Sequence, residues 1–584
     1  MTPLDIKRRS TAELMAIAVL SLFPDAQLAG GKSHAFGFFY DFMFSGTPDA
    51  HFLQLLEERM RFIASEDRLV HSKTMMRENA AMYFRHNKQN ILAERALSLD
   101  TNLVSLFCVD DFCDLCKEPY VRSTKDTLSF KIQGMKQIGT SDFKKIIRID
   151  AIAFETKSEI KKFLKKFEDA KARDPIQLSK ELQFISVLDE LDGKIMLQKK
   201  GVIFLRILQD FFRHEYENHG FSEEITPRLG DARLLQRLGI RKENIDDFFL
   251  NSSLSACMHA CNFQSEEHLE LSLPLRYFEF YDKYNLNIET REPCFYEKES
   301  VISDIATIFC SRAQVQEEIT CLLHFILKII KIFSIDHVLC LSSDKAPRGH
   351  SRFFWQEARG ILQEVYANVS KKVNSPLCEV VEEARDEAEF RTGPRLQFFF
   401  KNALGRKVEG PYIELNTFFP EKMGLTYIDE KNKKNVPFLV AANVCGSLES
   451  LMALLIEQYA GILPFWMAPE QVRIVCRSCG ASSICYAEKV RREFLQAGIR
   501  AFVDCSKNKS ENKLEHKIHV AQLEKVPYIV LIDDREIEDE IVREKQFMIR
   551  GLNQKEPVKM ELSCFIKKLT KLGSSNLDVI NQVQ

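Results

Sequence analysis

The sequence has no excess of charge of either sign. It holds 81 lysines and arginines against 83 aspartates and glutamates in 584 residues. A protein that binds nucleic acid through its overall charge is strongly basic, so any such contact here must use local patches. The hydrophobic fraction of 45% is ordinary for a globular protein. A chain of this length is expected to fold as about three or four domains.

Long hydrophobic runs and targeting signals are also missing. The most apolar stretch, Cys321 to Phe333, is interrupted by Lys328 and Lys331, which predicts an amphipathic core helix rather than a membrane span. The N-terminus, MTPLDIKRRS, is charged but is not followed by a signal-type cleavage site. We therefore expect a cytoplasmic protein that does not contact a membrane.

Cysteine is abundant, but its spacing does not match a zinc motif. The 16 cysteines are scattered, which is typical of buried free thiols in an intracellular protein. Two Cys-x-x-Cys pairs occur, Cys113/Cys116 and Cys476/Cys479, and they lie far apart in the chain. A zinc ribbon needs its two pairs much closer together, so the pattern favours thiols over metal ligands.

The hydrophobic pattern changes along the chain without any internal repeat. Short apolar runs alternate with turns from Thr11 to about Ile149, as in an α+β domain. Ser158 to Arg173 carries apolar residues at helical spacing between lysines, which predicts a connecting helix with a basic face. Those lysines are typical of a solvated face, and RNA contact is the alternative. From Ala468 onward strands alternate with helices, which predicts a small α/β domain with a mixed sheet.

The run GSLESL, which begins at Gly446, is followed by IEQYAG and LPFWMAPEQVRI. These segments resemble the threonyl-tRNA synthetases, a family of class II aminoacyl-tRNA synthetases, in which they form motif 3 and the entry to the anticodon-binding domain. AGIR at 497–500 and KVPYIVLIDDRE at 525–536 resemble that C-terminal domain. AKARDPIQLSKEL at 170–182 resembles the family's linker, and DLCKEPYVRST at 114–124 resembles its editing domain.

The resemblance covers nearly the whole chain and implies an α+β multidomain fold. The implied parts are an editing-like α+β domain at 1–150, a linker helix at 151–184, a class II catalytic-like domain with an antiparallel-sheet core at 185–465, an anticodon-binding-like α/β domain at 466–574 and a tail at 575–584. The chain begins about where the editing domain should, so we expect the family's small N-terminal TGS domain to be missing.

The residues that bind ATP in the family are substituted at the matching positions. The motif 2 arginine for the α-phosphate falls on Asn285, and the glutamate that contacts adenine falls on Asn287. A further arginine of the motif 2 loop falls on Glu297, and the motif 3 arginine falls on Ser450. Each lost charge-assisted contact costs about 1.5–3 kcal/mol, and the new carboxylates repel phosphate. The resemblance therefore implies that ATP binding is lost.

The zinc-ligand positions of the family are altered as well. Its ligands are one cysteine and two histidines, and these fall on Cys257, Thr307 and Ala441. A zinc site that keeps one position open needs three protein ligands, which this set does not provide. The neighbouring His259 and Cys261 could in principle rebuild a site, although ordinary loop residues are the simpler interpretation.

The editing chemistry is affected in the same way. The family's His-x-x-x-His pair, which positions the hydrolytic water, falls on Arg9 and Glu13. The cysteine of its Cys-x-x-x-His pair is kept as Cys116, but the histidine is Tyr120. Three of these four groups are replaced, so Cys116 is expected to serve packing.

These substitutions predict a catalytically inactive paralogue that binds tRNA or a protein partner. Scaffold residues such as Pro227, at the family's dimer interface, are kept, so we expect a homodimer or a heterodimer with a related synthetase. No cofactor is expected. One alternative is a divergent but active threonine–tRNA ligase, with ATP, magnesium and zinc and with a partner subunit. Another is a structural partner without any nucleic-acid role.

A lysine-rich segment in the C-terminal domain is the candidate tRNA contact. It falls where the family's Asn-Glu-Lys loop meets the anticodon, and it holds Lys507, Lys509, Lys513 and Lys517. The segment is longer than the family's loop and lacks its glycine. Because phosphate contact demands only positive charge, we expect salt-sensitive tRNA binding with modest sequence selectivity.

Overall fold

The computed structural model describes most of the chain, in two compact units. The described residues are 3–34, 36–44, 46, 48, 51–99, 101–115, 119–141, 144–188, 194–227, 258–263, 273–284, 295–296, 300–341, 352–372, 392–416, 419–429, 431–477, 480–504, 514–532, 546–552, 554 and 556–581. The units are Met1–Asp169 and Ala170–Gln584, so the boundary between them lies within helix α5 (Lys157–Lys171), in the segment predicted as the linker helix. None of the helices in these ranges is long and apolar enough to cross a lipid bilayer.

The first unit combines two antiparallel sheets with helices, as the α+β pattern predicts. One sheet has the strand order β1-β2-β7-β6 and the other β3-β4-β5. Helix α1 is buried along its centre because its apolar side chains pack onto the first sheet. The elements are α1 (Pro3–Leu22), β1 (Gln27–His34), β2 (Gly37–Met43), α2 (Phe52–Ser65), β3 (His71–Met76), α3 (Arg77–His86), α4 (Asn90–Leu97), β4 (Leu103–Val109), β5 (Phe112–Leu115), β6 (Ser129–Ser141) and β7 (Lys144–Phe154).

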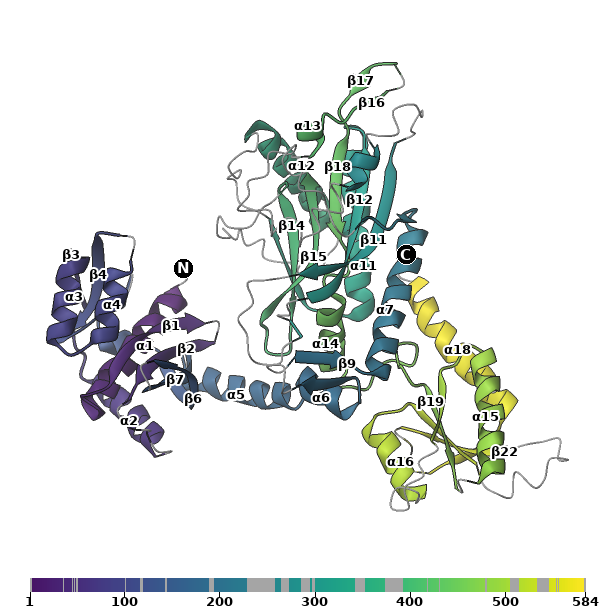
Figure 1. The fold of residues 1–584 in the computed structure, drawn as a ribbon, viewed down its shortest axis with the longest axis horizontal. Helices are drawn as coiled ribbons and strands as arrows, with labels where there is room; N and C mark the ends of the chain where they lie inside the picture. The colour runs from purple at the N-terminus through teal and green to yellow at the C-terminus, as the bar shows by residue number, and fades with distance from the viewer. Residues whose placement is uncertain are drawn as a thin grey trace. The chain divides into compact units, whose positions relative to one another are not determined.

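The second unit is built on a large sheet whose described strands run in the order β10-β11-β12-β18-β15-β14-β13 (Figure 1). All neighbouring pairs are antiparallel except β10 with β11, which confirms the predicted antiparallel-sheet core. The strands are β10 (Ser222–Glu223), β11 (Leu275–Tyr284), β12 (Ser300–Cys310), β13 (His337–Leu341), β14 (Arg395–Lys401), β15 (Lys407–Asn416) and β18 (Phe438–Asn443).

Long helices cover one face of this sheet. The apolar run at Cys321 to Phe333 is a core helix as predicted, and α11 begins earlier, at Val315. Its buried side chains pack with those of α7 and α14 against alternate residues of the central strands, which leaves the opposite face of the sheet for a site. The remaining elements of this part are α6 (Pro175–Glu181), β8 (Ile185–Leu188), β9 (Lys194–Leu197), α7 (Lys199–Asn218), α12 (Arg352–Lys372), α13 (Phe419–Met423), β16 (Tyr427–Ile428), β17 (Lys434–Asn435) and α14 (Leu448–Gln458).

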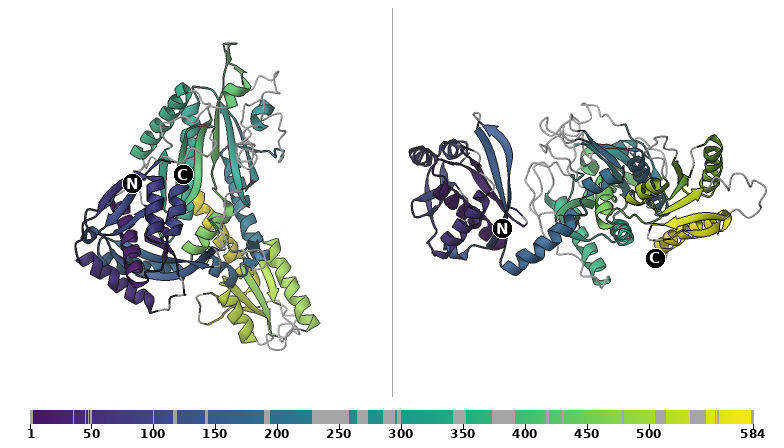
Figure 2. Two further views of the ribbon diagram at one scale, coloured as in Figure 1. Left: turned by 60° about the vertical axis from the view of Figure 1, so that its left-hand side comes forward. Right: turned by 90° about the horizontal axis from the view of Figure 1, so that it is seen from below.

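The C-terminal part of this unit is the mixed α/β fold that the sequence predicts. Its strand order is β20-β19-β21-β22-β23, with β19 parallel to β20 and β21 and with the other pairs antiparallel. Helices α15 and α18 pack on one face and α16 on the other (Figure 1 and Figure 2). The elements are β19 (Val472–Cys476), α15 (Ala481–Gln496), β20 (Ala501–Asp504), α16 (Leu514–Leu523), β21 (Tyr528–Ile532), β22 (Gln546–Gly551), β23 (Val558–Glu561) and α18 (Leu562–Asn581).

The last helix of the C-terminal part extends into the segment expected to be a tail. Helix α18 continues to Asn581, so most of the segment predicted as a tail from residue 575 is helical. The sequence after Gly573 contains no proline that would end a helix, which is consistent with this continuation.

Candidate functional site

The two positions that match the family's zinc histidines lie side by side on the open face of the large sheet. Thr307 in β12 is directly opposite Ala441 in β18, and on its other side it is opposite Tyr277 in β11. Residues opposite each other in antiparallel strands point to the same face, so these three side chains form one row. The structure thus brings two of the three predicted metal positions together. The third, Cys257, lies outside the described residues.

A histidine reaches this row from a separate segment. His259 lies in the helical stretch 258–263, and its Nδ1 atom is 2.9 Å from the Oγ1 atom of Thr307. Its ring centroid is 5.6 Å from that of Tyr277, and its Nε2 atom is 3.6 Å from a carboxylate oxygen of Glu224. Burial lowers the pKa of His259, and the nearby Glu279 opposes this only in part. The imidazole is therefore neutral at physiological pH and is buried beside the threonine hydroxyl.

The residues present in this row do not fit a zinc ion. Zinc needs three nitrogen, sulfur or carboxylate donors, whereas the row of Tyr277, Thr307 and Ala441 offers a phenol, a hydroxyl and a methyl group, and the imidazole of His259 lies beside it. In the part of the chain that the structure describes, no cluster of three or more histidine, cysteine, aspartate or glutamate side chains could hold a metal ion. Ala441 instead packs with Tyr281 and Ile305, so hydrophobic contacts occupy the space beside it.

The same row continues into a pair of charged residues. Ala441 is opposite Glu414 in β15, and Glu414 is opposite Arg395 in β14. The Glu414 carboxylate accepts hydrogen bonds from Arg395 and from the hydroxyl of Thr392, and Glu414 is buried. The positive charge of Arg395 is therefore matched within the protein.

The turn between β18 and α14 keeps the geometry of a motif 3 turn. Gly446 has φ +73°, a left-handed conformation that favours glycine, and a Cβ atom there would lie 3.3 Å from the Cα atom of Gly410. Its amide donates to the side chain of Asn443 at 2.6 Å, and its carbonyl accepts from Ser303 at 2.7 Å. The turn therefore lies close to the backbone of β15.

The motif 3 arginine position is filled by a small buried side chain. Ser450 lies in the first turn of α14, and its backbone amide donates to the N-cap hydroxyl of Ser447 at 3.3 Å. Its own hydroxyl is 3.5 Å from the backbone carbonyl of Phe295. The side chain thus makes local contacts and is too short to reach a phosphate. The motif 2 positions Asn285, Asn287 and Glu297 lie outside the described residues.

A buried aspartate holds the same turn from the helical side of the sheet. Asp304 in β12 accepts hydrogen bonds from the backbone amides of Val444 at 2.9 Å and Cys445 at 3.1 Å, and from the hydroxyl of Tyr216. Burial raises the pKa of Asp304 above its usual value, although these donors oppose the rise. Glu449, also buried, accepts from the amide of Ile302 at 3.0 Å. Both carboxylates therefore accept hydrogen bonds from backbone amides.

The positions that match the editing residues lie in the first unit. Arg9 and Glu13 are one helical turn apart on α1, and Glu13 is buried while Arg9 is half-buried. Tyr120 packs its ring edge-on against Phe107 with centroids 5.1 Å apart. Cys116 lies outside the described residues.

Sequence reasoning missed the residue at the centre of this cluster. Asp114 is buried, accepts a hydrogen bond from the hydroxyl of Tyr40, and is hydrogen-bonded to Glu13. Burial raises the pKa of Asp114, and two adjacent buried carboxyl groups share a proton more readily than both ionise. Asp114 opens the segment DLCKEPYVRST on which the editing resemblance rests, so it could have been found there.

The lysine-rich segment of the C-terminal domain is only partly described. Lys507, Lys509 and Lys513 lie outside the described residues. Lys517 was predicted in a loop, but it lies in helix α16 and is 1% exposed. The helix begins at Leu514, since Leu514 and Ile518 pack against the sheet at helical spacing. Lys517 is therefore a buried residue, and a direct contact with tRNA phosphate does not follow from its position.

Lys517 lines a charged cavity of about 560 Å³ within the second unit. In this cavity Arg473 binds Glu470 through two hydrogen bonds of 2.7 and 2.6 Å and also binds Glu524. Lys200 of α7 is 2.8 Å from Glu470, so the network joins the C-terminal domain to α7. Its lining residues are Gln183, Lys200, Glu470, Arg473, Phe502, Val503, Asp504, His516, Lys517, Val520 and Glu524.

Comparison with known proteins agrees with these features. The profile described as "Anticodon binding domain" matches residues 471–572. A solved structure titled as the RNA binding domain of threonyl-tRNA synthetase from Cryptosporidium parvum superposes with a TM-score of 0.58 and 23% identity, over 68% of this chain and 98% of that one. The antiparallel sheet, the motif 3 turn and the C-terminal domain define a class II aminoacyl-tRNA synthetase fold.

Curated relatives identify the family within this class. Threonine–tRNA ligase of Citrifermentans bemidjiense is 30% identical, over 92% of this chain and 84% of the relative. The enzyme of the same name from Methylobacillus flagellatus is 29% identical, over 97% of this chain and 88% of the relative. The chain belongs to the threonine–tRNA ligase family.

Proposed function

We propose that this chain is a catalytically inactive member of the threonine–tRNA ligase family that retains tRNA binding. The row formed by Tyr277, Thr307 and Ala441 is the observation that carries the proposal, because it offers a hydroxyl and a methyl group where the family has two zinc-binding imidazoles. A single buried, neutral His259 does not replace a set of three ligands.

Charge supports the same conclusion for ATP. Class II enzymes need cations against the triphosphate, yet the family's motif 3 arginine position holds Ser450, whose side chain is too short to reach a phosphate. On the open face of the sheet, Arg395 is bound by the carboxylate of Glu414. An arginine already paired with a carboxylate offers a phosphate little further attraction.

The C-terminal domain supports a retained role in tRNA binding. It matches the anticodon-binding profile along its length and keeps a complete hydrophobic core on the face that packs α15 and α18. Helix α5 adds a second basic surface, in which Lys161, Lys162, Lys165 and Lys166 are exposed and lie on adjacent turns. Binding through phosphate contacts needs no intact catalytic site.

We also propose that the chain assembles as a dimer or with a related synthetase. A pocket of about 940 Å³ opens beside β16 and β17, and its lining includes the exposed side chains of Phe354, Ile428 and Val436. Phe353 is 71% exposed next to it. Large hydrophobic side chains gathered on one surface favour a protein partner.

Isothermal titration calorimetry with ATP and with threonine tRNA tests the proposal. The expected result is no heat of binding with ATP at millimolar concentration and salt-sensitive binding of tRNA. A matched control is Ser450→Arg, which restores one phosphate ligand and is not expected to restore threonine activation. ATP binding by the natural sequence, with threonine-dependent turnover, would instead support the divergent active enzyme. Absence of tRNA binding at low salt would favour the protein-partner role.

A further inference from the structure

The hairpin formed by β4 and β5 carries two cysteines that face each other. Cys108 in β4 is the direct cross-strand partner of Cys113 in β5. Directly opposed residues of antiparallel strands have Cα atoms about 4.5–5.5 Å apart, which lies inside the range of about 4.4–6.8 Å that disulfides use. The Cys-x-x-Cys spacing suggests Cys116 as the partner of Cys113, but the fold places Cys108 opposite it.

We propose that Cys108 and Cys113 are a redox-active pair that a peroxide converts reversibly into a disulfide. Neither thiol takes part in the proposed tRNA-binding function, so the inference stands independently of it. The pair is formed by two strands of a single hairpin and requires no conformational change to meet.

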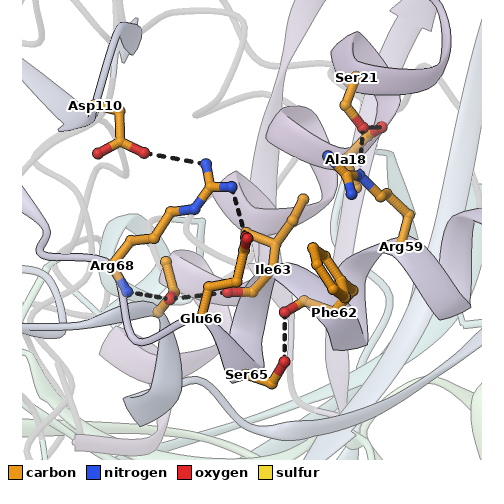
Figure 3. A network of polar contacts seen from close by, with 10 residues as sticks. Ala18, Ser21, Arg59, Phe62, Ile63, Ser65, Glu66, Arg68 and Asp110 are labelled. Carbon is orange, nitrogen blue, oxygen red and sulfur yellow. Dashed lines mark hydrogen bonds and ion pairs between the residues drawn. The ribbon is translucent and has the colours of Figure 1, made fainter.

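The hairpin is held rigidly at its turn. Arg68 donates to the carboxylate of Asp110 at 3.0 Å and also binds Glu66, as Figure 3 shows. The backbone amide of Arg68 donates to the hydroxyl of Thr124 at 3.0 Å, which fixes Arg68 itself. On the other side, the Tyr83 hydroxyl donates to the carbonyl of Asp111 at 3.1 Å. A turn fixed at both residues keeps the two thiols in register.

The two thiols have different environments, which assigns their roles. Cys108 is fully buried, whereas Cys113 is 9% exposed and is therefore the thiol that a small oxidant reaches. A hydrogen bond between the two thiols lowers the pKa of Cys113 to about 6 and raises the pKa of Cys108. The positive charge of Lys73 further favours the Cys113 thiolate. The thiolate is the form that reacts with peroxides.

The reaction balances with hydrogen peroxide as the only co-reactant. The Cys113 thiolate attacks one peroxide oxygen, the O–O bond breaks, and the leaving hydroxide takes a proton to become water. The Cys108 sulfur then attacks the sulfenic acid, the S–S bond forms and the S–O bond breaks. The second hydroxide takes the Cys108 proton and becomes a second water. The sulfur pair loses two electrons, and a dithiol reductant returns them.

The cross-link closes only a short loop, so it adds little stability through chain entropy. Its expected consequence is local, because Asp114 follows Cys113 directly and belongs to the buried cluster with Glu13 and Tyr40. Oxidation should therefore be detected by chemical analysis of the two sulfurs and not by a change in the melting temperature.

Peptide mapping of the oxidised full-length protein tests the proposal. The protein is treated with hydrogen peroxide, alkylated, unfolded and cut before aspartate residues without a reductant. We expect residues 100–109 to be joined to residues 111–113, and the link to vanish on treatment with dithiothreitol. A link between 111–113 and 114–125, which would use Cys116, contradicts the assignment, and so does the absence of any link.

Three variants make the result specific. Cys113→Ser should slow peroxide consumption by about tenfold or more, because the reactive thiolate is removed. Cys108→Ser should leave Cys113 as a sulfenic acid that a dimedone probe labels. Cys485→Ser, which removes an exposed cysteine of the C-terminal domain, should leave the cross-link unchanged. Equal rates in the Cys113→Ser variant and the natural sequence would overturn the proposal.

Discussion

The Nδ1 atom of His259 lies 2.9 Å from the hydroxyl of Thr307, in the row where relatives of this chain place zinc ligands. Because His259 is neutral and buried, the hydroxyl satisfies a ring nitrogen that would otherwise be buried without a partner. The Thr307 hydroxyl therefore supplies a polar partner for the buried imidazole within the protein.

Replacing that hydroxyl should destabilise the protein. Thr307→Val keeps the shape of the side chain but leaves the His259 nitrogen without its partner, at a cost of about 1–3 kcal/mol. Urea unfolding of the full chain measures the change. Thr320→Val in α11 is the control, because its hydroxyl bonds only to the helix carbonyl of Gln316 on a part-exposed surface. Equal effects of the two variants would contradict the importance of the His259 contact.

Metal analysis directly tests whether the row of Tyr277, Thr307 and Ala441 binds zinc. The purified protein should carry no stoichiometric zinc, since Thr307 and Ala441 cannot coordinate it. The measurement is elemental analysis by mass spectrometry after dialysis against zinc. One zinc per chain that disappears in a His259→Ala or Cys257→Ala variant would show that a rebuilt site exists.

The buried carboxyl pair of the first unit should make stability depend on pH. Burial raises the pKa of Asp114 in the folded chain, whereas the unfolded value is about 3.9. As the pH rises above about 4, the unfolded chain loses this proton first, so the free energy of unfolding falls until the folded pKa is passed. Denaturant unfolding between acid and neutral pH measures the slope. Asp114→Asn, which removes the titrating group, should flatten it, whereas Glu155→Gln, at an exposed ion pair with Lys7, should not.

The lysines of the C-terminal domain should separate into two classes. Changing Lys507, Lys509 and Lys513 together to alanine should weaken tRNA binding. It should also lower the slope of the salt dependence by an amount that corresponds to about three phosphate contacts. Lys517→Ala should instead lower the stability of the domain, because the side chain is buried against charged neighbours. Gel shifts at two salt concentrations and thermal unfolding distinguish the two effects. Loss of tRNA binding only in the Lys517→Ala variant, with unchanged stability, would reverse the assignment.

Assembly can be measured by light scattering. At micromolar concentration we expect a dimer, or a monomer that becomes a heterodimer when a related synthetase is added. Phe354→Glu should weaken this association because it places a charge on the apolar surface beside β16 and β17. A monomer under all these conditions would contradict the proposed assembly.

Local patterns predicted the framework of this fold well. The spacing of apolar residues identified α5 and α11, and the alternation after Ala468 identified the mixed sheet, because these features depend on residues close in sequence.

Contacts between distant segments could not be predicted in the same way. The partnership of His259 with Thr307 requires the 258–263 helix to be placed over β12, and that of Cys113 with Cys108 requires the hairpin register. Lys517 was predicted in a loop because a run of lysines is typical of loops. It lies in a helix because Leu514 and Ile518 pack on the sheet. In each case tertiary packing, and not the local sequence pattern, determines where the side chain lies.

Threonine-dependent pyrophosphate exchange tests the central claim most directly. The purified protein should show no exchange above background at millimolar ATP and threonine, alone or with added tRNA. Ser450→Arg should not restore exchange, because Thr307 and Ala441 still provide no zinc ligands. A related threonine–tRNA ligase measured in parallel provides the positive control. Robust exchange by the natural sequence, abolished by a substitution in the row of Thr307 and Ala441, would contradict the account and establish an active ligase.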